Sequence, residues 1–132
     1  MTETRVSIHS DADIIAARRM GRELAEGVGF SGSELTIIAT AISEIARNIL
    51  EYAGNGEIVL RQTQQGPKRG ILVIAKDRGP GIPDIELAMQ DGYSTSKGIG
   101  LGLPGSRRLM DEFEVDSKVG KGTTVTMKKW VA

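Results

Sequence analysis

The feature that most restricts how this chain can fold is a stripe of large aliphatic side chains in its first half. These residues recur every three or four positions after Ser33, so they share one face of a helix expected from residue 33 to 53. The opposite side of this helix is polar and includes Glu44 and Asn48. The apolar face must be buried, whereas the polar stripe faces either solvent or a ligand. The apolar stripe consists of Leu35, Ile38, Ile42, Ile45 and Ile49.

The segments before this helix predict a strand and a first helix. Val6 and Ile8 alternate with polar neighbours, which is typical of a short strand. Apolar residues then recur at helical spacing after Ser10 or Asp11, either of which can be the N-cap, and the pattern stops between Gly27 and Gly29. We therefore expect a strand followed by two amphipathic helices.

The segments after the helix predict a sheet. Residues 58–60 and 71–74 favour an antiparallel pair of strands, and the unbroken apolar run at 71–74 predicts burial on both faces. A short helix is expected after Asp84 and a third long helix from about Leu103 to Phe113. Two closing strands are expected near Val115 and at 123–131. No repeat or linker interrupts the pattern, so residues 1–132 predict a single domain.

Composition narrows the classes of function. The 17 basic and 17 acidic residues of this 132-residue chain cancel and are interspersed, which argues against nucleic-acid binding. There is no cysteine, no apolar run approaching the roughly 18 residues of a membrane span, and no apolar signal segment at the start. These properties predict a soluble cytoplasmic protein without a membrane or nucleic-acid partner.

Two places in the chain offer side-chain chemistry. Glu44 and Asn48 stand one helical turn apart and project from the same face, although such a pair can also be a solvated surface. Asp77 follows a buried strand and precedes the turn Gly79-Pro80-Gly81, where a carboxylate can be fixed and accept a hydrogen bond from an exocyclic amine. The alternative for Asp77 is an ordinary turn residue.

A glycine-rich loop supplies the third element. Gly98, Gly100 and Gly102 lead into a helix, and consecutive backbone amides beside a helix N-terminus suit phosphate groups. Residues 100–105 also satisfy G-x-G-x-x-G, but they do not follow a strand or open a βαβ unit, so a dinucleotide site is excluded. The phosphate-loop pattern G-x-x-x-x-G-K-[ST] is absent from the sequence.

Four ordered motifs together resemble the nucleotide-binding boxes of the GHKL superfamily of ATPases and kinases. Residues 44–48 resemble the N box, residues 77–82 the G1 box, residues 98–103 the G2 box, and Gly122-Thr123 the closing Gly-Thr pair. Within that superfamily the chain is most similar to the short anti-sigma-factor-type serine/threonine kinases of the stressosome switch kind. The resemblance extends over nearly the whole chain and implies the Bergerat ATP-binding fold. That fold is an α/β two-layer sandwich, with a mixed, mostly antiparallel sheet covered on one face by helices.

The resemblance also implies roles for individual residues. Asn48 would coordinate the Mg²⁺ ion, Asp77 would bind the adenine amino group with support from Thr123, and Glu44 would be the general base. This agrees with the needs of phosphoryl transfer, which depends mainly on positioning and charge neutralisation. The residues expected to bind Mg-ATP are Asn48, Asp77, Gly79, Gly81, Ile82, Gly98, Gly100, Leu101, Gly102 and Thr123.

The implied activity is transfer of the ATP γ-phosphate to a serine or threonine of a STAS-domain protein of the stressosome scaffold type, within a partner-switching pathway. Activation of a phosphatase by direct binding is a further implied role. An ATP-dependent binding switch with little transfer is the main alternative. A histidine kinase core is a weaker alternative, because the one histidine, His9, lies in the expected first strand. A gyrase-like ATPase would need further domains.

Overall fold

The computed structural model describes residues 3–82 and 102–132. The described strands form one five-stranded sheet in the order β1-β2-β3-β5-β4, and each of its four neighbouring pairs is antiparallel. The sheet was predicted to be mixed and mostly antiparallel; its antiparallel character is confirmed, and none of the described strand pairs is parallel. The strands are β1 (Glu3–Ile8), β2 (Gly56–Gln65), β3 (Lys68–Asp77), β4 (Glu112–Lys118) and β5 (Gly122–Trp130).

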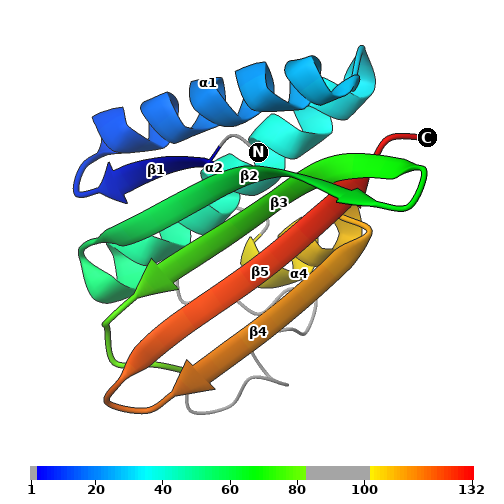
Figure 1. Cartoon of the computed structure of the whole chain (residues 1–132). Coiled ribbons are helices and arrows are strands. Elements are labelled where there is room, and N and C mark those ends of the chain that lie inside the picture. Colours follow the sequence, from blue (N-terminus) through cyan, green and yellow to red (C-terminus); the bar gives the residue numbers. More distant parts are fainter. Residues whose placement is uncertain (1–2, 83–101) are drawn as a thin grey trace.

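Three described helices form the second layer on one face of the sheet (Figure 1). They are α1 (Asp11–Val28), α2 (Ser33–Ala53) and α4 (Gly102–Leu109). The predicted α/β two-layer sandwich is therefore confirmed. Burial alternates from Ile71 along β3 because every second side chain points toward the helices. Leu60, Val73 and Met127 are fully buried between the layers.

Helix α2 is the centre of the core. Its aliphatic stripe is buried as predicted, with Ile38, Ile42 and Ile45 at most 1% exposed. The helix ends where Gly54 adopts a φ of 83°, a conformation that glycine reaches without steric cost. Because its aliphatic face is packed in the core, α2 holds the polar residues of its opposite face in fixed positions.

Two details of the sequence prediction are corrected by the structure. The third long helix ends at Leu109 rather than Phe113, because residues 112–118 alternate exposed and half-buried positions and form strand β4. Residues 71–74 are not buried on both faces: Ile71 and Val73 face the helices, whereas Leu72 and Ile74 are only half-buried. The short helix expected after Asp84 lies outside the described residues.

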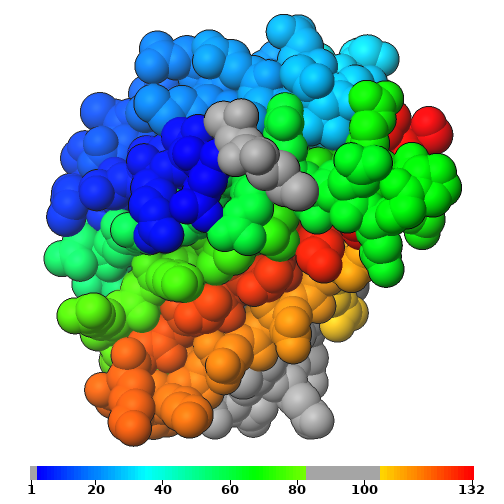
Figure 2. Space-filling model, in the orientation of Figure 1, coloured from blue at the N-terminus to red at the C-terminus, as the bar shows by residue number. Residues whose placement is uncertain are grey.

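Leu72 and Ile74 lie on the sheet face opposite the helices, which strands β2 to β5 present in the space-filling view (Figure 2). Charged pairs occupy the same face at its β1 edge, where Arg5 Nη1 bonds Glu57 Oε1 at 2.9 Å and Arg61 bonds Glu3. The hydrogen bond from Arg61 holds the pKa of the Glu3 carboxyl below its usual range. This face thus combines a small apolar centre with ion pairs.

Close packing of α1 on α2 gives a testable effect on stability. A β-carbon on Gly21 would overlap Cδ1 of Ile42, which is fully buried. We expect Gly21→Ala to cost about 1–3 kcal/mol by overpacking, offset by roughly 1 kcal/mol of helix propensity. Ile42→Val removes Cδ1, so the double variant should be more stable than the two single changes predict. Urea unfolding of all four proteins measures this coupling, and additive free energies would contradict the contact.

Candidate functional site

Glu44 and Asn48 lie on the same face of α2 and are both partly buried. The Glu44 side chain is 13% exposed and its Oε1 accepts a 2.8 Å hydrogen bond from Nη1 of Arg47, whose side chain is 43% exposed. The structure therefore brings the two residues together as predicted. It also adds Arg47, which holds one oxygen of the proposed base in an ion pair.

Asp77 is the last residue of β3, and two backbone groups fix its carboxylate. Oδ1 accepts hydrogen bonds from the N–H of Gly79 at 2.9 Å and from the N–H of Thr123 at 3.3 Å. Thr123 lies on β5, the neighbouring strand in the sheet. The orientation of the Asp77 side chain is thus set from both its own turn and the adjacent strand.

The glycines around Asp77 allow three segments to approach closely. A β-carbon on Gly79 would lie 2.6 Å from Cβ of Ala53 at the end of α2. Gly81 has a φ of 79° and lies against the carbonyl of Lys118, and Gly122 lies against the carbonyl of Asp77. Packing within the protein therefore already requires glycine at these positions. The same contacts place the Asp77 turn against the end of α2.

Helix α2 connects the two parts of the candidate site. Ala53, which touches Gly79, follows Asn48 by five residues, or about 7.5 Å along the helix axis. Gly102 is the first residue of α4, and α4 packs against α2. Gly98, Gly100 and Leu101 lie outside the described residues. The described part of the site is an elongated array from Glu44 to Asp77, which suits an extended ligand.

One residue of this region was missed by the sequence analysis. Oγ of Ser117 on β4 lies 2.7 Å from the N–H nitrogen of Ile82 and 2.7 Å from Oγ1 of Thr123. Ser117 shares its sheet face with Phe113 and Val115, so it is a polar residue at an inward position of a strand. That departure from apolar alternation was the signal that could have found it.

The donor set can be tested against Mg²⁺. Among the described residues no three His, Cys, Asp or Glu side chains gather in a metal-binding group. In nucleotide sites Mg²⁺ keeps several waters and takes one or two protein ligands together with phosphate oxygens. The side-chain oxygen of Asn48 meets that requirement without a cage of carboxylates. No described helix has the length and apolar character needed to cross a membrane.

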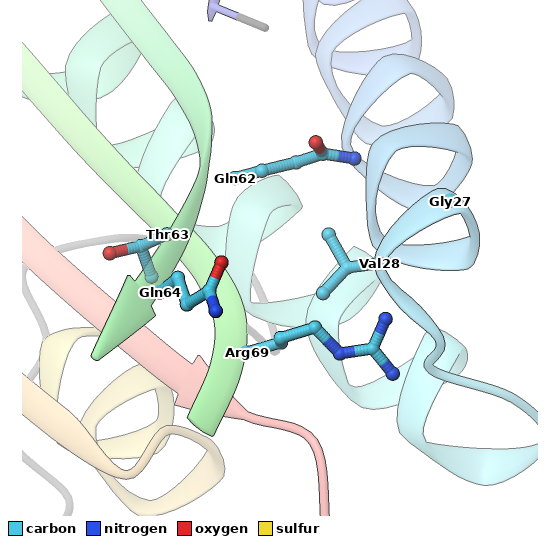
Figure 3. A pocket seen from close by; sticks show the side chains of 6 residues that line it. All are labelled: Gly27, Val28, Gln62, Thr63, Gln64 and Arg69. Atoms are coloured by element: carbon cyan, nitrogen blue, oxygen red, sulfur yellow. The ribbon is translucent and has the colours of Figure 1, made fainter. Parts of the chain in front are cut away.

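A separate hollow of about 140 Å³ lies between the end of α1 and the β2–β3 hairpin (Figure 3). It is at the opposite end of β3 from Asp77, because Gln64 and Arg69 pair beside the hairpin turn. It contains none of the residues predicted to bind ATP. Its lining residues are Gly27, Val28, Gln62, Thr63, Gln64 and Arg69.

Comparisons with known proteins agree with this architecture. The model of the family described as histidine kinase-like ATPase domain matches residues 9–129. The serine/threonine-protein kinase RsbT of Bacillus subtilis (strain 168) is 51% identical over 126 residues, which are 96% of this chain and 95% of that protein. The anti-sigma F factor of Thermoanaerobacter sp. (strain X514) is 38% identical, over 74% of this chain and 71% of that protein.

A solved structure shows the same fold at low sequence identity. The crystal structure of the RsbU and RsbW domains of Rv1364c from Mycobacterium tuberculosis matches 98% of this chain with a TM-score of 0.68 and 20% identity. The match spans 32% of the solved chain, so it concerns one part of a longer protein.

A helical layer on an antiparallel sheet, matched in this way in sequence and in fold, is the ATP-binding domain of a kinase. The chain belongs to the histidine kinase-like ATPase family. The nearly full-length match at 51% identity confirms the prediction of a serine/threonine protein kinase of the partner-switching type. A protein kinase has a protein substrate, which agrees with the predicted kind of partner. The roles of the individual site residues remain predictions.

Proposed function

We propose that this protein transfers the γ-phosphate of Mg-ATP to a serine or threonine hydroxyl of a separate small STAS-fold protein of the stressosome scaffold type, in the cytoplasm. The whole of residues 1–132 would act as one kinase domain. The observation that carries the proposal is the 51% identity to a serine/threonine-protein kinase over 96% of the chain. Activation of a phosphatase by direct binding would be a second role of the same protein.

The geometry supports a division of labour along α2. Asn48 would hold Mg²⁺, which neutralises phosphate charge when bound, and Glu44 one turn away would accept the proton of the attacking hydroxyl. Asp77, fixed through Oδ1, would bind the adenine amino group near the other end of the array. Gly79, Gly81 and Ile82 would border the base. Thr123 would support Asp77, and the phosphates would lie against residues Gly98, Gly100, Leu101 and Gly102.

A binding switch with little transfer is a second candidate, and one contact favours it. Glu44 is ion-paired with Arg47 at 2.8 Å, so one oxygen of the proposed base is already engaged within the protein. The relative named anti-sigma F factor is also named for a protein that it opposes rather than for transfer. Both candidates use the same ATP site and differ in whether the partner is modified.

A transfer assay separates the two candidates. The protein is incubated with ATP labelled at the γ-phosphate and with purified STAS-domain proteins, and the labelled partner is then treated with acid or with alkali. We expect an acid-stable label, because phosphoserine and phosphothreonine survive acid whereas phosphohistidine does not. An acid-labile label would overturn the serine/threonine assignment, and complete absence of label despite ATP-dependent binding would favour the switch.

A further inference from the structure

Ser117 is unusual in this site because three polar groups converge on its single side-chain oxygen. Oγ accepts a hydrogen bond from the N–H of Ile82 at 2.7 Å, lies 2.7 Å from Oγ1 of Thr123, and donates to the carbonyl of Gly122 at 3.3 Å. Ser117 is half-buried on the helix-facing side of β4. Its hydroxyl thus joins the end of the Asp77 turn to the strand that carries Thr123.

The number of hydrogens available limits the directions that these bonds can take together. A serine hydroxyl has one hydrogen to donate and two lone pairs to accept with. If that hydrogen goes to the carbonyl of Gly122, both lone pairs are filled by the N–H of Ile82 and the hydroxyl hydrogen of Thr123. All three contacts are satisfied together only in this arrangement. The hydroxyl of Thr123 then has no hydrogen left, and its Oγ1 can only accept.

The Asp77 carboxylate, like the Thr123 hydroxyl in this arrangement, can only accept hydrogen bonds. Its Oδ1 is engaged by the backbone of Gly79 and Thr123, and Oδ2 has no partner among the described residues. An ionised carboxylate accepts and does not donate. The N–H of Thr123 donates to Oδ1 of Asp77, so Thr123 lies beside the Asp77 carboxylate. The region beside them therefore offers acceptors to a ligand, which favours a ligand edge that donates hydrogen bonds.

We propose that Ser117 is a specificity-determining positioning residue, which holds the Thr123 hydroxyl as an acceptor and so selects a base with an amino group over one with a carbonyl oxygen at the same place. This inference rests on the proposed ATP site and extends it to a residue outside the four motifs. Adenine carries an amino group at position 6, whereas hypoxanthine carries a carbonyl oxygen there. Loss of Ser117 frees the Thr123 hydrogen to donate to that carbonyl.

The test measures discrimination rather than affinity alone. Calorimetry gives the Kd values of Mg-ATP and Mg-ITP for the parent protein and for Ser117→Ala. The parent should bind ATP more tightly than ITP. The ratio of the Kd for Mg-ITP to the Kd for Mg-ATP should fall by about fivefold to tenfold in Ser117→Ala, which is the effect of one hydrogen bond. Ser117→Thr keeps the hydroxyl and should keep the ratio. A loss of protein stability alone would weaken the binding of both nucleotides equally and leave the ratio unchanged.

Two further variants keep the test decisive. Ser117→Cys preserves the shape of the side chain but replaces the oxygen by a weak acceptor, so it should also lower the ratio. This variant provides the test if Ser117→Ala does not fold. Since Ser117 acts through Thr123, adding Ser117→Ala to Thr123→Val should not change the ratio further. A ratio that is the same in the parent, Ser117→Ala and Ser117→Cys would overturn the role of Ser117 alone. Failure of the parent to bind ATP would overturn the proposed function and this role together.

Discussion

Replacing Glu44 with alanine is expected to lower the rate of phosphoryl transfer by about 10²- to 10⁴-fold, the usual contribution of a general base. Binding of Mg-ATP should change little, because the base acts on the incoming hydroxyl rather than on the nucleotide. Single-turnover transfer to the partner protein measures the rate, and calorimetry measures nucleotide binding. The separation of these two quantities distinguishes a base from a residue that only supports the fold.

Two further variants make this experiment more specific. Asn48→Ala should show the reverse behaviour and lose the Mg²⁺-dependent part of ATP binding, because a metal ligand acts on the bound nucleotide. Glu23→Ala removes an exposed carboxylate of α1, away from the polar face of α2, and should leave both quantities unchanged. Equal transfer rates for Glu44→Ala and the parent would remove Glu44 from the role of base.

The second large effect is expected at Asp77. Asp77→Asn should weaken ATP binding by roughly 1.5–3 kcal/mol, about 10- to 150-fold, through the loss of a hydrogen bond to a charged acceptor. The asparagine oxygen can still accept from the N–H groups of Gly79 and Thr123, so the turn should remain folded. The hydrogen bond to adenine is then lost at the position of Oδ2, where the amide nitrogen of asparagine replaces an acceptor by a donor. Calorimetry with ATP and GTP measures the effect, and GTP should bind poorly to the parent.

Asp116→Asn is the matched control for this change. Asp116 is an exposed carboxylate of β4, and it faces away from the helical layer because it alternates with Val115 and Ser117. The same substitution there should leave ATP affinity unchanged. If the parent bound ATP and GTP equally and Asp77→Asn altered neither affinity, the assignment of the adenine contact to Asp77 would be wrong.

Much of the fold could be predicted because its elements carry strong local patterns. The aliphatic stripe predicted helix α2 with its observed bounds, Ser33–Ala53. The glycines after α1 and α2 marked the ends of these helices. The errors arose where local pattern was ambiguous. The segment that contains Phe113 follows a helix directly and was assigned to it, although pairing with β5 makes it a strand. The apolar run at 71–74 indicated a strand correctly but not which face the helices cover.

The candidate site was predictable only where residues close in sequence supply it. Glu44 and Asn48 share a helix face, so their proximity follows from spacing alone. The ion pair of Glu44 with Arg47 depends on a choice of side-chain conformation, and the bond between Ser117 and Thr123 depends on the register of β4 against β5. Neither can be read from composition or motif order. The resemblance to known ATP-binding boxes named residues but gave no reason to include Ser117.

The bond between Asp77 and Thr123 joins residues that lie 46 positions apart, and Arg5 meets Glu57 across 52 positions. Closing such long loops costs chain entropy before any contact repays it, so sheets of this kind fold on slower timescales than helical bundles. The proposed adenine end of the site therefore forms only once the chain has folded as a whole. Binding of ATP to that state adds to the global free energy of unfolding by mass action, about 2.7 kcal/mol at a concentration 100 times Kd. Fragments that lack β5 should have no adenine site, so nucleotide protection reports the fraction of completely folded chains.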